Sequence, residues 1–186
     1  MTFQEGLKQV EKANKTIVDA NELIVDATMN AFLFTWSWWI ALAMLVVPWF
    51  LWAIFRKRES SARLLFVGFI IMLLSTYLDG IGVDFGKWTY PVKVIPLPTI
   101  SYSFRNSVIP VTIMFLIQYK SHLNPFFKAL GFGAFGAFVG MPIMSMLDLY
   151  NKVDWAYTYS FFIFTALFLI GHWFSRRKSF EMIGGK

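Results

Sequence analysis

The sequence predicts an all-α membrane protein: a bundle of about five transmembrane helices with an extracytoplasmic, amphipathic N-terminal helix. Apolar residues make up 57% of the 186 residues and charged residues only 15%, whereas an average soluble protein carries roughly 25% charge. The charges are crowded into short tracts, so the stretches between them are almost free of charge. A helix needs about 20 apolar residues to cross a bilayer, and several of these stretches are close to that length.

Residues 1–30 differ from the rest and are expected to form the extracytoplasmic amphipathic helix. Phe3, Leu7, Val10, Ile17 and Ile24 recur at spacings that place them on one helix face. Three lysines against five acidic residues make the segment a poor ligand for anionic lipid. It lacks the features of a cleaved signal peptide, so the first span is expected to be retained. A helix leaning on the outer surface is favoured over a protein-binding or self-associating segment.

Five apolar stretches are predicted to span the membrane. Residues 31–55 carry no ionisable side chain, and Pro48 is expected to kink this helix. Residues 64–79 are short for a span unless the helix continues past Asp79. Residues 100–119 are interrupted by Arg105 and Pro110. The last two spans are residues 129–147 and 156–174, and residues 175–186 form a cytoplasmic tail.

The distribution of Lys and Arg predicts the orientation. Six lysines and nine of the eleven acidic residues fall on the side of the N-terminus. Ten basic residues fall on the other side: Arg56, Lys57, Arg58, Arg63, Lys120, Lys128, Arg176, Arg177, Lys178 and Lys186. Cytoplasmic loops of membrane proteins are enriched in Lys and Arg. The chain is therefore expected to cross a bacterial plasma membrane with its N-terminus outside the cell and its C-terminus in the cytoplasm. Tryptophans near both ends of the first and fifth spans agree, since indole prefers the headgroup level.

The segment between the second and third spans holds the candidate site. At 1.5 Å per residue, Asp79 and Arg105 lie about 22 and 21 Å from the same membrane boundary, so a buried ion pair between them is expected. Glycines and prolines nearby predict irregular backbone, which at membrane depth occurs only inside protein or against a water-filled cavity. Two interpretations of this segment remain open: an outward-facing polar pocket, or an ordinary external loop whose aromatic side chains lie at the membrane interface. The pocket would be lined by Asp79, Asp84, Trp88, Tyr90, Tyr102 and Arg105.

The fourth span carries small residues on one helix face: Ala129, Gly133, Gly136, Ala137 and Gly140. Gly136 and Gly140 form a G-x-x-x-G pair, which lets a neighbouring helix approach closely. Packing within the chain is favoured over packing on a second copy. The same stretch matches G-x-G-x-x-G, but no strand precedes it, so dinucleotide binding is rejected.

No residue is predicted to be catalytic, and no metal or cofactor is expected. The chain has no cysteine. His122 and His172 lie far apart in the sequence without a nearby glutamate, so they do not indicate a metal site. The lipid bilayer is the expected partner, with a protein partner or a homo-oligomer as further candidates and no nucleic acid.

The motifs Asp79–Pro91, Ile109–Val111 and Leu116–Tyr119 carry a resemblance to a known family. They are similar to small multi-pass membrane proteins of Bacillus-like and clostridial bacteria, a family without an established biochemical activity. The family often has an acidic residue shortly before its Pro-Val pair, where this chain has Arg105 and Asn106. The Asp-to-Pro stretch is also similar to lycopene-cyclase-type domains, but the chain has no glutamate between Glu59 and Glu181.

The sequence is compatible with three kinds of function. A non-enzymatic membrane protein that acts through protein partners or assembly is favoured. The alternative is a small channel or carrier with an outward-facing polar pocket around Asp79 and Arg105. A carrier would need a polar cavity that continues toward Gln118 and His172. An intramembrane enzyme, which is disfavoured, would need Asp79 and Asp84 to converge.

Overall fold

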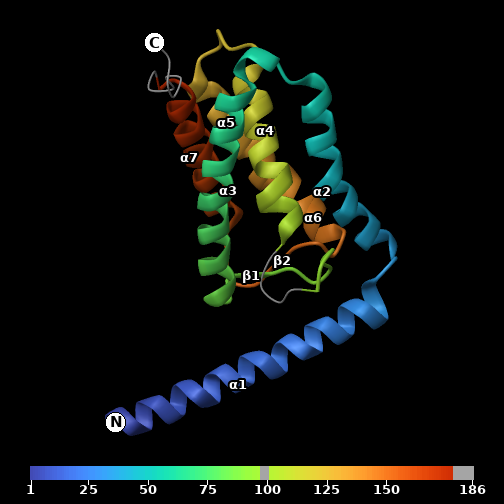
Figure 1. Cartoon of the computed structure of the whole chain (residues 1–186), viewed down its shortest axis with the longest axis vertical. Helices are drawn as coiled ribbons and strands as arrows, with labels where there is room; N and C mark the ends of the chain where they lie inside the picture. Colours follow the sequence, from blue (N-terminus) through green and yellow to red (C-terminus); the bar gives the residue numbers. More distant parts are fainter. Residues whose placement is uncertain (97–100, 178–186) are drawn as a thin grey trace, which may run out of the picture.

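The computed structural model describes residues 1–96 and 101–177, and most of them are helical. Helices α2, α3, α4, α5 and α7 pack alongside one another, and α1 lies apart across one end of this bundle (Figure 1). The helices are α1 (Phe3–Ala27), α2 (Trp36–Phe55), α3 (Ser61–Asp84), α4 (Ile109–Gln118), α5 (Pro125–Phe135), α6 (Met141–Met146) and α7 (Tyr157–Ser175). Two short strands, β1 (Trp88–Thr89) and β2 (Asn151–Lys152), pair at the end of the bundle nearer α1 (Figure 1).

Four helices in the described part of the chain are long and apolar enough to cross a membrane: Trp36–Phe55, Arg58–Asp84, Pro125–Met146 and Tyr157–Ser175. A further apolar helix, Phe104–Gln118, is shorter. The expected second span therefore continues five residues beyond Asp79 as α3. The expected first span begins later, because residues 31–35 belong to the connection between α1 and α2.

Helix α3 continues through Gly80 and Gly82 and ends at a glycine in the left-handed conformation. Gly86 has φ = 64°, which costs glycine little because it has no Cβ atom. The Lys87 amide donates to the Gly82 carbonyl and the Gly86 amide to the Val83 carbonyl, the pattern of a Schellman cap. The cap turns the chain back beneath α3 and so brings Trp88 under the helix that carries Asp79.

A π-helical turn, Phe104–Val108, precedes α4 and contains Arg105. Pro110 has no amide hydrogen, so it cannot bond the carbonyl of Asn106 in the preceding turn. The indole of Trp49 on α2 donates to that carbonyl instead, at 2.9 Å. The proline thus creates an acceptor inside the bundle that fixes α4 against α2.

The end of α4 lies beside the end of α2. The Gln118 side chain donates to the Phe55 carbonyl and accepts from the Lys57 amide, both at 2.9 Å. Lys128 on α5 donates to the carbonyl of Leu116 in the last turn of α4 and to that of Tyr119, the residue after α4. Carbonyls at the C-terminal end of a helix have no partner within the helix. Before the π-helical turn that precedes α4, the Ser103 hydroxyl donates to the Ala41 carbonyl of α2 at 2.7 Å. The stretch from Ser103 through the π-helical turn and α4 therefore runs beside α2 from Ala41 to Phe55.

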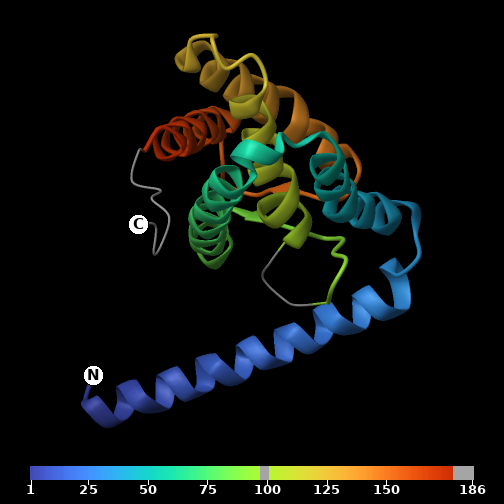
Figure 2. The ribbon, with the colours of Figure 1, turned by 45° about the horizontal axis from the view of Figure 1, so that its top comes forward.

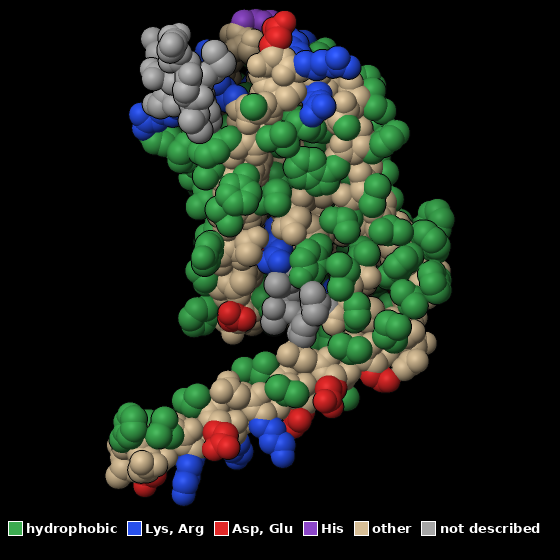
Figure 3. All heavy atoms as spheres, viewed as in Figure 1, with side chains coloured by type: hydrophobic (Ala, Val, Ile, Leu, Met, Phe, Trp, Pro, Cys, Tyr) green, Lys and Arg blue, Asp and Glu red, His purple; other side chains and the backbone are tan. Residues whose placement is uncertain are grey.

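The bundle core is small and apolar, and large apolar side chains also cover the outside. One cluster of buried residues joins α3, α4, α5 and α7: Val67, Ile71, Ile113, Ala129, Leu167 and Phe168. Exposed phenylalanines and leucines cover the outer surface of the bundle (Figure 3). Two tryptophans expected at the membrane surface, Trp38 and Trp52, are instead buried inside the protein. These two tryptophans therefore do not mark the membrane boundaries of α2.

The small-residue face of the fourth span packs on α7 of the same chain. A Cβ atom added to Gly133 would lie 2.8 Å from the Phe161 carbonyl oxygen, and one added to Gly136 would lie 2.8 Å from the Phe164 ring. Ala129 and Ala137 are fully buried. Gly140 differs, because an added Cβ would approach only the Phe135 carbonyl of its own helix.

Candidate functional site

The two loops at the α1 end of the bundle are joined by short strands and an ion pair. Trp88 pairs with Lys152 and Thr89 with Asn151 in antiparallel register. Lys87 contacts Asp154 at 2.6 Å on the surface. This contact lowers the pKa of Asp154, through the hydrogen bond and the charge of Lys87. The loop after α3 is thereby held to the loop before α7, and both contribute side chains to the space between the helices.

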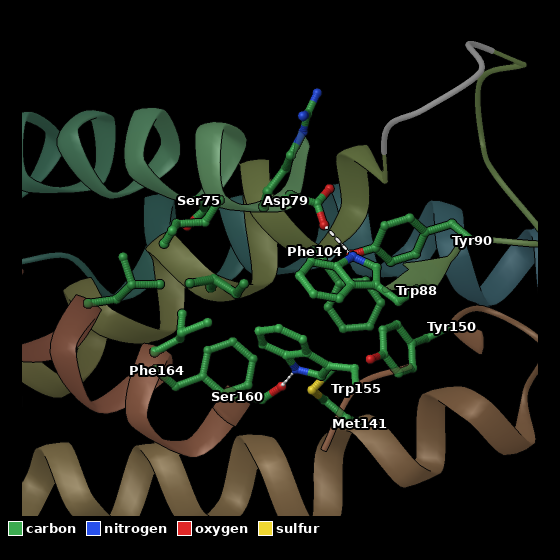
Figure 4. Close-up of a pocket in the computed structure, with 15 residues that line it drawn as sticks. Ser75, Asp79, Trp88, Tyr90, Phe104, Met141, Tyr150, Trp155, Ser160 and Phe164 are labelled. Atoms are coloured by element: carbon green, nitrogen blue, oxygen red, sulfur yellow. Dashed lines mark hydrogen bonds between the residues drawn. The ribbon is translucent and has the colours of Figure 1, made fainter. Parts of the chain in front are cut away.

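A cavity of about 80 Å³ lies between α3, the residues before α4, α6 and α7. Figure 4 shows its aromatic walls and the side chains that line it. The lining residues are Ser75, Leu78, Asp79, Trp88, Tyr90, Phe104, Arg105, Ile109, Met141, Tyr150, Trp155, Ser160, Ile163, Phe164 and Leu167. Most of these side chains are aromatic or aliphatic, and charged groups are contributed only by Asp79 and Arg105.

Asp79 is 9% exposed and is held by two aromatic donors. The Trp88 indole donates to Asp79 Oδ1 at 3.0 Å, and the Tyr90 hydroxyl donates to the same oxygen at 2.5 Å (Figure 4). Burial, followed by the Asp79 charge, raises the pKa of Tyr90 well above its usual value, so its phenol keeps the proton that it donates. Both donors act on one oxygen, which fixes the orientation of the carboxylate.

Polar atoms around the cavity have no hydrogen-bond partner in the structure. These atoms are Asp79 Oδ2, Arg105 Nε, the Ser75 hydroxyl and the Tyr150 hydroxyl. Burial raises the pKa of Tyr150, so this side chain is a neutral hydroxyl at physiological pH. A buried polar atom without a partner costs about 1–3 kcal/mol. The site therefore combines apolar walls with a carboxylate oxygen and hydroxyls that are able to accept further hydrogen bonds.

Arg105 is buried and lines the same cavity. The expected ion pair with Asp79 is not formed among the contacts of the described residues. The guanidinium instead lies over the Tyr102 ring, 5.2 Å from its centroid. Counting residues along a helix gives the height of a side chain but not its direction around the helix axis, so the count predicts a shared level and not a contact.

The structure brings together four of the six residues predicted for the pocket: Asp79, Trp88, Tyr90 and Arg105. Tyr102 lies outside the cavity and contacts Arg105. Asp84 is exposed at the last residue of α3, so the two aspartates do not converge.

One wall of the cavity is formed by α7 and by the loop before it, and the sequence does not predict this wall. The loop before α7 carries Tyr150 and Trp155 into the cavity. The Trp155 indole donates to the Ser160 hydroxyl at 2.9 Å (Figure 4). Strands of two residues have no periodicity to detect, which explains why the pairing of the loops left no signal.

Gln118 and His172 lie at the end of the bundle away from α1 and do not belong to the cavity. The Gln118 amide is engaged with α2 as described above, and the His172 ring lies parallel to the Phe168 ring. Neither side chain lines the cavity. Over residues 1–96 and 101–177, no group of three or more His, Asp or Glu side chains is arranged to hold a metal ion.

Comparisons of the chain with models of known protein families, with curated proteins and with solved structures found no match.

Proposed function

We propose that the chain is a non-enzymatic integral membrane protein that binds a small ligand in the cavity beside Asp79. In this proposal it spans a bacterial plasma membrane five times, with Phe104–Gln118 as the additional span and the Lys- and Arg-rich end in the cytoplasm. Basic side chains gather at the end of the bundle opposite α1, which supports this orientation (Figure 3). Membership of the uncharacterised bacterial family is part of the same proposal.

The contacts of α4 support the fifth span. Ser103, which precedes the π-helical turn before α4, lies beside Ala41, and the end of α4 lies beside Phe55. The stretch from Ser103 to Gln118 therefore extends along α2, which is itself long enough to cross. The helix is short, but the π-helical turn that precedes it adds length at the end near the cavity. Buried irregular backbone of this kind is compatible with membrane depth because other helices cover it.

The observation that carries the ligand proposal is the buried carboxylate with one free oxygen in an aromatic cavity. Asp79 Oδ1 is occupied by Trp88 and Tyr90, whereas Oδ2 has no partner. A ligand with an apolar body and a hydrogen-bond donor would place the body against the rings and the donor on Oδ2. At about 80 Å³ the cavity holds a group of only a few heavy atoms, so the ligand is either small or inserts one end.

Binding fits the geometry better than transport or catalysis does. The residues that line the cavity do not include Gln118 or His172, so the cavity does not extend toward the basic end as a carrier would require. Asp84 lies outside the cavity, so a second carboxylate for acid–base chemistry is missing from its walls.

Thermal unfolding of the purified protein with matched probes tests the proposal. Isobutanol, which has a donor, is expected to raise the melting temperature by about 3–5 °C at ten times its Kd, whereas 2-methylbutane, which has none, leaves it unchanged. Asp79→Asn replaces the acceptor with an amide donor and should abolish the shift. Ser75→Leu fills the cavity and should do the same, whereas Thr158→Leu on the exposed side of α7 should not.

An equal shift with both probes would contradict the proposal. The same conclusion would follow if the isobutanol shift persisted in Ser75→Leu, because the alcohol would then be acting on the detergent or on another surface. The Thr158→Leu variant controls for the added bulk of leucine.

A further inference from the structure

Helix α1 is an amphipathic helix without buried residues. It has 25 residues, so it is about 37 Å long. Phe3, Leu7, Val10 and Ile17 are all exposed. At 100° per residue these side chains fall on one face, and all eight charged residues of α1 fall on the opposite face. A helix with this pattern buries its apolar face in something that the bundle of the same chain does not supply.

The direction of α1 is fixed at its junction with α2. Residues Thr28–Phe32 form a π-helical turn, and Leu33 donates from its amide to the Thr28 carbonyl at 2.9 Å. The Thr35 hydroxyl donates to the Phe32 carbonyl at 2.7 Å and accepts from the Trp38 amide at the start of α2. Phe32 and Leu33 also pack against the cluster of Val92 and Leu149 in the outer loops. This junction is short and bonded, so it sets the path of α1 relative to the bundle.

The path of α1 runs across the end of the bundle, and Figures 1 and 2 show this from two directions. Figure 3 shows the charged side chains of α1 along the side away from the bundle and apolar side chains along the nearer side. If the bundle crosses a bilayer, α1 lies parallel to the membrane surface and its apolar face points toward the hydrocarbon. The exposed rings of Phe34, Trp36 and Trp39 continue this apolar surface onto the start of α2.

We infer that α1 is an in-plane membrane helix that embeds its apolar face in the outer lipid interface. The burial of apolar side chains, and not charge, holds α1 in the lipid, because the polar side of α1 carries three lysines and five acidic residues. Zwitterionic lipid is therefore sufficient, and added anionic lipid does not strengthen the contact. The inference rests on the proposal that the bundle spans the membrane.

Site-specific fluorescence in liposomes tests this inference on the full chain. The chain has no cysteine, so single cysteines are available without other changes. The apolar-face variants are Leu7→Cys, Val10→Cys and Ile17→Cys, and the matched charged-face variants are Lys8→Cys, Lys12→Cys and Lys15→Cys. Each is labelled with an NBD fluorophore and reconstituted in phosphatidylcholine that contains lipid with a spin label near the headgroup.

The expected result is at least twofold stronger quenching at the three apolar positions than at the three charged ones, unchanged when a third of the lipid is phosphatidylglycerol. Equal, weak quenching on both faces would overturn the inference and show a solvated helix. Apolar positions shielded from aqueous iodide but not quenched by the lipid label would also overturn it, in favour of a protein partner or a second copy. Phe69→Cys, on the exposed side of α3, separates the two proposals: if a label there does not contact lipid, the membrane assignment itself fails.

Discussion

The position of Trp88 depends on a single missing methyl group on the helix above it. Gly82 lies directly against the indole ring, and a Cβ atom at this position would overlap the ring. Gly80 is only two residues earlier on α3, but a Cβ atom there would meet nothing within 4 Å. The two glycines look equivalent in the sequence, yet only Gly82 is required by the packing.

Gly82→Ala should therefore displace Trp88 and break its bond to Asp79. Overpacking together with a lost bond to a buried carboxylate predicts a loss of about 3 kcal/mol in the free energy of unfolding. Gly80→Ala should be neutral or stabilise by about 0.5–1 kcal/mol, because alanine favours the helix. Unfolding in mixed detergent micelles, followed by tryptophan fluorescence, measures both. Equal losses in the two variants would show that the ring does not occupy this position.

At this scale the sequence identifies the right carboxylate but not its partners. Asp79 and Arg105 are recognisable as buried charges because charge is rare in the spans. Their directions depend on the cap at Gly86 and on the π-helical turn before α4, both of which are properties of tertiary packing. Trp88 and Tyr90 could be named as neighbours of Asp79, but their role as its donors follows only from the folded path of the loop.

Among the elements, the contact between the fourth span and α7 is the one that small residues control most directly. Gly133 faces the backbone and side chain of Phe161 as well as Thr165, whereas Gly131 faces open space. Gly133→Ala should push the helices apart and lower the free energy of unfolding by about 2 kcal/mol. Gly131→Ala adds the same methyl group to the same helix and should not destabilise it. The same unfolding measurement compares the two, and a neutral Gly133→Ala would exclude close packing on α7.

The limits of the helices show where sequence patterns are insufficient. Apolar length finds the four long apolar helices of the described chain, because an uncharged stretch of about 20 residues is typical of a membrane span. It fails at the end of α3, where Gly80 and Gly82 lie inside the helix. Only Gly82 makes room for Trp88 to pass beneath the helix. It also misses the wall of the cavity that comes from Tyr150 and Trp155, since a two-residue strand carries no pattern.

For the whole molecule, the two ends of the bundle have different roles. The end near α1 contains the paired strands β1 and β2, the cavity and the amphipathic helix α1 (Figure 1). The other end holds the basic residues, together with Gln118 and Lys128, which bond the ends of α2 and α4 (Figure 3). In the function proposed above, the protein exposes its binding site on the outer side and fixes its orientation by charge on the inner side.

The most direct test of this account is the side of the membrane on which each end of α4 lies. Asp84→Cys and Ser121→Cys place single reactive thiols at exposed positions before and after this helix, in a chain that has no other cysteine. In intact bacterial cells, a membrane-impermeant maleimide should label position 84 and should label position 121 only after lysis. Labelling of both positions in intact cells would contradict the crossing by α4, and labelling of position 121 alone would contradict the orientation.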